Sequence, residues 1–308
     1  MYYFIVNPKA SSGRGMKKWK RLAALLDKHQ IPYKVSFTKQ AGSAIEYARS
    51  ITSRGENLIL VAVGGDGTAN EVLNGICDFV HTTFAYVPAG SGNDLARSLN
   101  LPTDPEAVLR LLLHPQAVRS LNIGCAQSGH VSRRFLVNSG IGFDAAVCHE
   151  ALNSRMKKFL NRFHLGKLTY LGIALKQIIL LKGVQANLIL DSGHEISFPK
   201  IFFCIFMNGK YAGGGFKFCP DSLPDDDLLD VCLVEQVSKL KFLRVLPSAF
   251  SGKHTGIKEV HLYRCRRAHI KTPRPLAVHT DGESFHFQND LTLFLLDSRL
   301  KMIAPKSN

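Results

Sequence analysis

Three glycines fall within the four residues Gly64–Gly67, directly after the apolar run 58–63, and Asp66 lies among them. Glycines at a strand end let backbone amides approach a phosphate, and amides at a helix start suit anions. A carboxylate here is compatible with phosphate if Mg²⁺ or lysine lies between them, because hard cations prefer oxygen ligands. Asp66 could also accept backbone N–H groups and brace the turn. These two interpretations are compatible, and the sequence leaves both open.

Small and hydroxyl residues follow four apolar runs in the first half of the chain. The four stretches are NPKASSGRG from Asn7, FTKQAGS around Thr38, GGDGTANE from Gly64 and PAGSGNDLA from Pro88. One glycine-rich turn usually serves only a tight connection, but four with polar neighbours indicate a site for a phosphorylated ligand. Neither the P-loop pattern nor a dinucleotide-binding glycine fingerprint occurs, so the stretches predict a different phosphate site.

A second candidate group lies in HTDGES, where Asp281 and Glu283 are two residues apart. If the preceding strand continues, its two-residue period puts both carboxylates on one face, where repulsion suits one of them to accept a proton. If Gly282 opens a turn, that geometry fails, and Asp-Gly is a hairpin corner. Either carboxylate could act as the general base for a hydroxyl that attacks a phosphorus atom.

Five aspartates gather in CPDSLPDDDLLDV, residues 219–231, in a chain otherwise short of acidic residues. Carboxylates at this density repel one another unless a cation or solvent screens them. The stretch is therefore either a cation site or a solvated acidic turn.

The elements that must position these residues alternate between strand and helix patterns through the first half. Strands are predicted over 3–6, 33–37, 58–63 and 84–87, and helices over 16–29, 43–53 and 69–79. This alternation predicts a parallel sheet covered by helices on both sides. Ligands of such a sheet gather where strands end and helices begin, which is where the glycine-rich stretches lie.

After about residue 120 the pattern changes to short strand-like runs, which predict an antiparallel sandwich or barrel-like domain with helical stretches near 143–181 and 238–248. The apolar stretch 165–181 is too short for a spanning helix of roughly 20 residues, so no transmembrane segment is expected. We expect instead an amphipathic helix whose packed face is formed by Leu168, Leu171, Gly172, Leu175 and Ile179. HEALN lacks the second histidine of a zinc protease motif, so His149 and Glu150 are expected on a helix surface.

Composition narrows the class of protein. The 308 residues carry a formal charge of +15, which attracts nucleic acid, nucleotide phosphates or an anionic membrane. No helix-turn-helix, zinc-finger or RNP pattern accompanies this charge, so no nucleic-acid partner is expected. Seven cysteines without a C-x-x-C pair argue against a disulfide framework or zinc site and favour the reduced cytosol. The opening MYYFIVNPKA has no basic leader and is predicted to be a first strand.

In their order along nearly the full chain, NPKASSGRG, GGDGT, PAGSGNDLA, the Pro-Asp stretch and DGE resemble the diacylglycerol kinase catalytic family. The likeness is nearest to soluble bacterial lipid kinases, with sphingosine and ceramide kinases as relatives. GGDGT alone is shared with NAD kinases and 6-phosphofructokinases, whereas the ordered set is highly specific. The resemblance implies an α/β nucleotide-binding domain of that kind followed by a β-rich sandwich domain. We expect the first over 1–125 with 291–308 returning to it, and the lipid-substrate domain over 126–290.

The resemblance also implies roles for individual residues. Contacts to ATP are expected from Asn7, Pro8, Lys9, Ala10, Ser11, Thr38, Gly64, Gly65, Asp66, Gly67, Thr68, Ala69, Asn70, Glu71 and Ser91. The family's proton acceptor lies in the DGE motif, which favours Asp281 as the base and Glu283 as alternate or metal-side partner. A structural Mg²⁺ is implied at Asp226 and the carbonyls of Leu223 and Leu228. Asp227 departs from the pattern, because the family usually has glycine there and aspartate tolerates positive φ less readily.

The implied activity is ATP- and Mg²⁺-dependent phosphoryl transfer to diacylglycerol or a similar hydroxyl lipid by a cytoplasmic enzyme in peripheral contact with the membrane. Basic stretches at 16–21 and 155–167 are candidate membrane contacts or solvated helix faces. A homodimer also follows from the resemblance. The alternatives are an NAD kinase-like enzyme and a non-catalytic lipid- or nucleotide-binding regulator that retains the fold.

Overall fold

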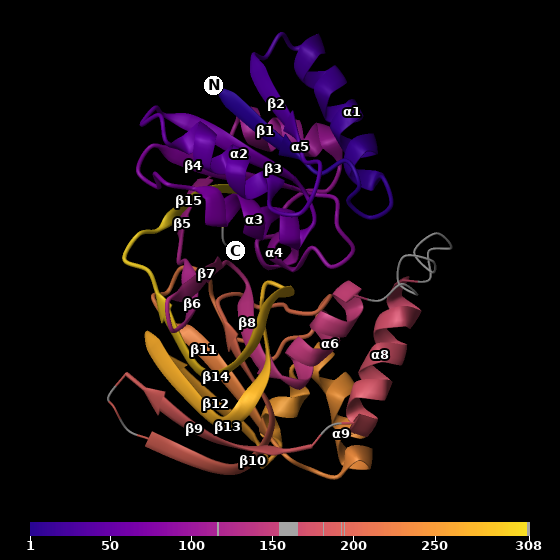
Figure 1. The fold of residues 1–308 in the computed structure, drawn as a ribbon. Helices are drawn as coiled ribbons and strands as arrows, with labels where there is room; N and C mark the ends of the chain where they lie inside the picture. Colours follow the sequence, from indigo (N-terminus) through magenta and orange to yellow (C-terminus); the bar gives the residue numbers. More distant parts are fainter. Residues whose placement is uncertain (116, 154–165, 181, 192, 194, 307–308) are drawn as a thin grey trace. The chain divides into compact units, whose positions relative to one another are not determined.

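The computed structural model describes residues 1–115, 117–153, 166–180, 182–191, 193 and 195–306. The chain divides into two compact units, Met1–Ile123 with Asp297–Asn308, and Gly124–Leu296. Each unit has its own sheet (Figure 1) and is described by itself. Among the helices in the described ranges, none combines the length and the apolar character needed to cross a membrane.

The first unit is built on a six-stranded sheet with the strand order β2-β1-β3-β4-β15-β5. Its strands are β1 (Tyr2–Val6), β2 (Tyr33–Phe37), β3 (Leu58–Gly64), β4 (Thr82–Pro88), β5 (Ala117–Leu121) and β15 (Leu300–Ala304). The first four strands pair in parallel, so their carboxyl ends lie at one edge of the sheet. Strand β1 has β2 on one side and β3 on the other, so the chain order reverses there, which is where such sheets bind ligands.

Helices connect the parallel strands and cover both faces of this sheet. They are α1 (Arg14–Lys28), α2 (Ser43–Thr52), α3 (Asp66–Gly75), α4 (Asp94–Ser98) and α5 (Pro105–Leu113). The apolar period of α1 buries Trp19 and Leu22 in one core with Phe4 of β1 and with α5. Helices α2 and α3 pack so closely that a Cβ atom on Gly75 would lie 2.7 Å from the Cβ atom of Ala48. The predicted alternation of strands and helices is therefore confirmed.

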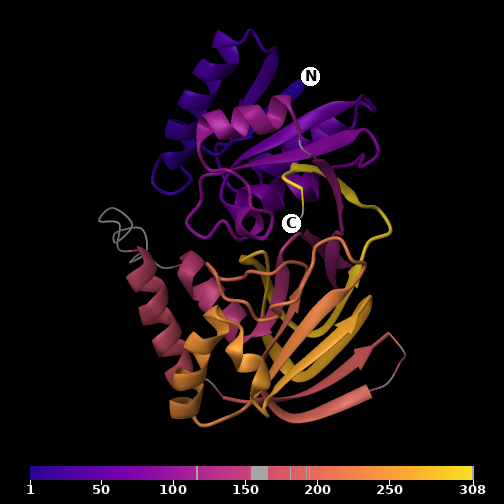
Figure 2. The same ribbon diagram turned by 180° about the vertical axis from the view of Figure 1, so that it is seen from behind.

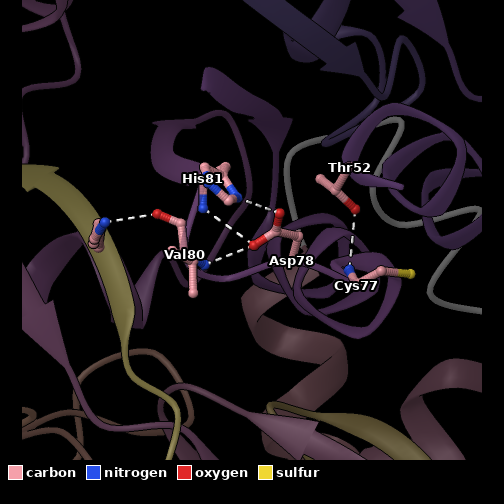
Figure 3. A network of polar contacts seen from close by, with 6 residues as sticks. Thr52, Cys77, Asp78, Val80 and His81 are labelled. Atoms are coloured by element: carbon pink, nitrogen blue, oxygen red, sulfur yellow. Dashed lines mark hydrogen bonds and ion pairs between the residues drawn. The ribbon is translucent and has the colours of Figure 1, made fainter. Parts of the chain in front are cut away.

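The loop between α3 and β4 shows how the returning strand is fixed to this unit. Asp78 accepts the amides of Val80 and His81, and its other carboxylate oxygen lies 2.6 Å from His81 Nδ1 (Figure 3). The hydrogen bond from His81 lowers the pKa of the Asp78 carboxyl. Lys301 of β15 donates to the carbonyl of Val80 at 2.7 Å, so the loop and the last strand are joined.

The second unit contains one nine-stranded antiparallel sheet with the order β12-β11-β10-β8-β13-β14-β6-β7, and β9 pairs with both β10 and β13. Its strands are β6 (Gly124–Ser128), β7 (Val131–Phe135), β8 (Asn138–Gly142), β9 (Val184–Leu190), β10 (Glu195–Met207), β11 (Leu229–Glu235), β12 (Val260–Cys265), β13 (Arg267–Thr280) and β14 (Glu283–Leu295). Apolar residues of nearly all these strands share one core. The β-rich second half is therefore confirmed.

Three helices lie on one side of these strands in both views (Figures 1 and 2): α6 (Phe143–Asn153), α8 (Gly166–Leu180) and α9 (Lys239–Val245). The helix expected within 165–181 is present, but the expected packed face is wrong at Gly172, Leu175 and Ile179, while the side chains of Leu168 and Leu171 lie outside the described ones. Leu175 and Ile179 are 42% and 69% exposed, whereas Ile173 and Ile178 are buried. The helix is apolar around most of its circumference, so the sequence period did not identify which side the strands cover.

The end of the second unit also differs from expectation. Residues 291–295 were expected in the segment that returns to the first unit, but they form the end of β14, and residues 292–295 pair with β6. Leu291 and Leu293 are fully buried in the core of the second sheet, which holds them there. The returning segment begins at Asp297 instead.

Candidate functional site

The loops after β1 and β3 meet at the edge where the parallel strands end. The side-chain amide of Asn7 donates to the hydroxyl of Thr68 at 3.2 Å, and the Asn7 backbone amide donates to the carbonyl of Val63. Asn7 also accepts the amide of Lys9 at 3.1 Å, which folds its own loop. After β2, Thr38 lies at the same edge, where its backbone amide donates a hydrogen bond to the carbonyl of Val6. Four of the predicted contacts thus share one edge of the sheet.

The loop after β4 joins the same group. The hydroxyls of Ser11 and Ser91 lie 3.2 Å apart although 80 residues separate them. Asn93 accepts the amide of Gly90 at 2.8 Å and the hydroxyl of Tyr86 at 3.3 Å. Burial, with Asp66 and Asp94 nearby, raises the pKa of Tyr86 well above its ordinary value, so its phenol remains a neutral donor.

Three helices begin at this edge, α1 at Gly13, α3 at Gly65 and α4 at Asn93, and in none of them does the side chain of the N-cap residue cap the helix. Amides in the first turn of a helix have no partner inside the helix, and they are suited to phosphate oxygens. The loop before α1 adds backbone strain, because Ser11 and Ser12 have φ angles of 45° and 59°. Left-handed residues other than glycine cost free energy and cluster at binding sites.

Asp66 braces two loops. Its Oδ1 atom accepts the amide of Leu95, in the first turn of α4, at 3.3 Å. The bracing that the sequence allowed is therefore present, and it reaches the start of the next helix. This contact also answers why a carboxylate stands among the glycines, since it fixes the distance between the GGDGT loop and the loop after β4.

Glu71 points towards α2. Its two carboxylate oxygens accept the amides of Gly42 and Ala44 at 3.0 and 3.2 Å, which caps a helix that has no side-chain cap of its own. Gly42 has a φ angle of 85°, so a residue with a side chain would be strained there. The structure thus gives Glu71 a structural task in addition to the predicted ATP contact.

In the second unit, the residues Asp281 and Gly282 form a two-residue hairpin turn between β13 and β14. Their φ angles are 50° and 81°, and Thr280 pairs with Glu283. Of the two arrangements that the sequence left open, the structure therefore shows the turn at Gly282, and the two carboxylates do not lie on one face of a continuing strand. Asp-Gly supports positive φ at both turn positions, so the chain reverses instead of continuing.

The carboxylate of Asp281 is anchored to the start of β8. Oδ2 accepts the amide of Leu136 at 3.0 Å, and Oδ1 accepts the amides of Val137 and Asn138 at 2.9 and 3.0 Å. The Asp281 amide in turn donates to the Asn138 carbonyl at 2.8 Å. Four hydrogen bonds thus fix the position of the turn against residues about 145 positions earlier in the chain.

Sequence reasoning missed the groups that lie beneath this turn. His279 and Asp144 form a buried pair with Nε2 and Oδ2 2.9 Å apart. His149, expected on a helix surface, is half-buried and lies 2.7 Å from the Val278 carbonyl and 3.0 Å from the Ser284 hydroxyl. Burial lowers the pKa of His149. Only the proximity of His279 to DGE in the sequence could have drawn attention to it.

The guanidinium of Arg264 lies against the acidic stretch 219–231. Arg264 of β12 donates to Asp226 and, at 3.0 Å, to Asp230, and the second Asp226 oxygen accepts the Leu228 amide at 3.1 Å. Burial raises the pKa of Asp230, while Arg264 opposes that shift. In the described ranges, no three His, Cys, Asp or Glu side chains gather as a metal site. Both Asp226 oxygens are thus engaged, so this arrangement does not fit Mg²⁺ unless Arg264 moves.

Asp227 follows with a φ angle of 66°. This is the left-handed conformation that glycine adopts without strain, and aspartate adopts it here at a cost. The backbone at position 227 therefore has the conformation expected of a glycine, although the residue is an aspartate.

Comparison with known proteins bears on both units. Residues 1–125 match the diacylglycerol kinase catalytic domain, and residues 138–289 match the YegS C-terminal NAD kinase beta sandwich-like domain. A diacylglycerol kinase of Bacillus subtilis is 27% identical over 283 residues, which cover 91% of this chain and 88% of that protein. A diacylglycerol kinase of Mycobacterium tuberculosis is 26% identical over 281 residues, covering 91% of this chain and 87% of that protein.

Solved structures share the fold. A crystal structure described as a diacylglycerol kinase from Bacillus anthracis has a TM-score of 0.70 at 21% identity, covering 98% of this chain and 96% of that one. A second structure from the same organism has a TM-score of 0.76 at 23% identity, with the same coverage. At this identity the likeness concerns the fold.

Proposed function

We propose that this chain, whose residues 1–125 match the diacylglycerol kinase catalytic domain, is a lipid kinase that transfers the γ-phosphoryl group of ATP to a lipid hydroxyl. The acceptor is diacylglycerol or a similar lipid, and the product is of the phosphatidic acid type. Mg²⁺ accompanies the nucleotide, and the protein works in the cytoplasm as a homodimer.

The observation that carries this proposal is the convergence of loops at the carboxyl edge of the first sheet. Hydrogen bonds join Asn7 to Thr68 and Ser11 to Ser91, and three helices begin there without a cap from their own N-cap residue. Amides from several helix starts can bind phosphate oxygens together, which supports a nucleotide with more than one phosphate. Asp66 holds the start of α4 through the Leu95 amide, and Glu71 holds the start of α2 through the Gly42 amide.

We further propose that the DGE turn, Asp281–Gly282–Glu283, carries the residues that act on the lipid hydroxyl. Bound ATP with Mg²⁺ supplies the phosphoryl group and neutralises its charge. Three backbone amides fix the direction of the Asp281 carboxylate, so this group can orient a lipid hydroxyl and accept its proton. Glu283, the first residue of β14, is the alternate acceptor. A metal ion at Asp226 has no part in the proposed transfer, because Arg264 already neutralises that carboxylate.

A membrane-bound substrate requires contact with a lipid surface, and two basic stretches were candidates. In the stretch 16–21, Trp19 is buried while Lys17, Lys20 and Arg21 are exposed, so it offers charge without an apolar anchor. Residues 155–165 of the other stretch lie outside the described residues.

The exposed face of α8 supports a contact in the second unit. Leu175 and Ile179 lie one turn apart and face solvent, next to Lys176. Lys239 of α9 donates to the Ile179 carbonyl, and the neighbouring Leu240 is 60% exposed. Apolar side chains among lysines suit the interface of an anionic membrane, so we assign the peripheral contact to this face.

The experiment that tests the activity offers the protein a choice of acceptor. Purified protein is incubated with ATP labelled in the terminal phosphate, Mg²⁺, total lipid extract and NAD, and both product classes are quantified. The expected result is label in lipid. Label only in NAD would show an NAD kinase-like enzyme, and absence of label with retained nucleotide binding would show a regulator.

A further inference from the structure

His279 is held between a carboxylate and the turn that carries the proposed proton acceptor. It lies two residues before Asp281, and its side chain is 5% exposed. Its Nε2 atom is 2.9 Å from Oδ2 of Asp144, which lies in the first turn of α6. On the other side of the ring, the amide of Gly282 donates to Nδ1 at 3.1 Å. Both ring nitrogens are therefore engaged, one by a helix and one by the turn.

The two contacts together fix the tautomer of the ring. A backbone amide can only donate, so Nδ1 must be the acceptor and carries no proton. The ring proton is then on Nε2 and is donated to Asp144. The other Asp144 oxygen is buried and has no hydrogen-bond partner among the described residues. Among the described residues, the Asp144 carboxylate therefore accepts a hydrogen bond only from His279. This hydrogen bond sets the orientation and the tautomer of the His279 ring.

Space for the pair is created by Gly140 of β8. A Cβ atom on Gly140 would lie 1.8 Å from Oδ2 of Asp144 and 2.8 Å from Nε2 of His279, closer than any real contact. Gly140 is also the residue paired with His279 across the strands. The His279 carbonyl accepts the hydroxyl of Ser139 at 2.8 Å, so β8 holds the histidine through its backbone as well.

Stability alone does not account for this arrangement. An Asp-Gly turn forms between antiparallel strands without help from a side chain. Burial of an imidazole and a carboxylate costs desolvation free energy, and apolar side chains of similar volume would commonly serve a core as well or better. What the pair adds is precision, because it fixes the amide of Gly282 on one side while three backbone amides fix the Asp281 carboxylate on the other.

We propose that His279, oriented by Asp144, is a positioning residue that holds the Asp281–Gly282–Glu283 turn in the geometry needed for phosphoryl transfer. The inference rests on the proposed function, because the turn carries the assigned proton acceptor. His279 itself touches neither nucleotide nor lipid in this assignment. Its effect reaches the reaction through one hydrogen bond to the turn.

Two substitutions of His279 separate its two contacts. Asparagine places an amide oxygen near the position of Nδ1, so His279→Asn keeps an acceptor for the Gly282 amide and loses the contact with Asp144. Glutamine places its amide near the position of Nε2, so His279→Gln keeps a partner for Asp144 and loses the acceptor for the turn. Both variants remove an imidazole from the same buried place, so each is the other's control for lost packing.

The kinetic arm compares kcat and KM for lipid phosphorylation. Misplacement of a reacting group by about 1 Å can cost about 100-fold in rate. We expect kcat of His279→Gln to fall about 100-fold and that of His279→Asn to fall less than about tenfold. The KM for ATP should stay within about threefold in both, since the first unit is unchanged. Equal losses of kcat, or losses that follow the loss of thermal stability, would overturn the proposal.

A second arm needs no activity. Nitrogen-15 NMR of the His279 ring is expected to show the proton on Nε2, and amide exchange at Gly282 is expected to be faster in His279→Gln than in His279→Asn. A proton on Nδ1, or equal exchange in the two variants, would contradict the inference. If the wild type shows this ring and turn but phosphorylates no lipid, the proposed function fails while the geometry of the turn stands.

Discussion

A Cβ atom added to Gly90 would lie 2.6 Å from the Cα atom of Gly65, so the loops after β3 and β4 touch through their backbones. Substitution Gly90→Ala must push these loops apart, because the opposing atom is backbone and cannot rotate away. Overpacking of this kind costs about 1–3 kcal/mol. If about half of that falls on the bound state, the dissociation constant for ATP rises about 2- to 10-fold. Isothermal titration with ATP measures it.

Gly256→Ala is the matched control. No heavy atom lies within 4 Å of a Cβ atom there, and the residue has no positive φ angle. The ATP dissociation constant of this variant should equal that of the wild type. Unchanged ATP affinity in Gly90→Ala would show that the contact of the two loops does not shape the nucleotide site.

Glu71→Ala should destabilise the first unit more than it weakens ATP binding. The side chain caps α2 through the amides of Gly42 and Ala44, and loss of a cap costs about 1 kcal/mol. For a unit of this size we expect a drop of roughly 3–8 °C in its melting temperature. Glu46→Ala removes an exposed glutamate from the same helix start and should cost less than about 0.5 kcal/mol. A large loss of ATP affinity at full stability would assign Glu71 to the nucleotide instead.

The left-handed residue Asp227 predicts an order of stability among variants. Asp227→Gly and Asp227→Ala both remove the carboxylate, but only glycine adopts a φ angle of 66° without strain. The glycine variant should therefore be more stable than the alanine variant by about 1 kcal/mol, as measured by urea unfolding. Equal stability of the two would mean that the turn relaxes when the side chain is removed.

Stability should decrease in mild acid through His254. This residue is buried and lies 3.0 Å from the Phe218 carbonyl, and burial lowers its pKa from the ordinary value of 6.5. Below 6.5 the unfolded chain therefore binds more protons than the folded protein, so the free energy of unfolding falls as the pH falls towards the lower folded value.

His254→Gln keeps a side-chain N–H for the Phe218 carbonyl and does not titrate. Between about pH 7.5 and about pH 5.5 the wild type should lose more unfolding free energy than this variant. Parallel loss in both proteins would assign the acid sensitivity to other groups, such as His149, whose pKa burial also lowers.

Most of the first unit was predictable because its elements are local in sequence. The apolar runs at β3 and β4 and the glycines after them define strand ends, and parallel pairing then brings those ends together. The second unit was predicted only as a β-rich class. Strand β9 pairs with both β10 and β13, and no local pattern encodes such a choice of partners.

What sequence reasoning missed depends on distant contacts. Asp144 and His279 are 135 residues apart, and Glu71 reaches the start of α2 from 27 and 29 residues away. The place of Glu71 in the GGDGTANE motif predicts a contact with the nucleotide, but its carboxylate lies against the start of α2. The exposed face of α8 could not be predicted for the same reason. Whether an apolar residue of this helix is buried depends on the elements that pack against the helix, not on the spacing of apolar residues in the sequence.

The most direct test of the account measures phosphatidic acid formed from diacylglycerol in anionic vesicles with ATP and Mg²⁺. The wild type, Asp281→Asn and Glu283→Gln are compared after each is shown to be folded and to bind ATP. The account predicts product with the wild type and at least about 100-fold less with Asp281→Asn, since the anchored carboxylate no longer accepts the hydroxyl proton. Full rates in both variants, or no lipid product from the wild type, would contradict it.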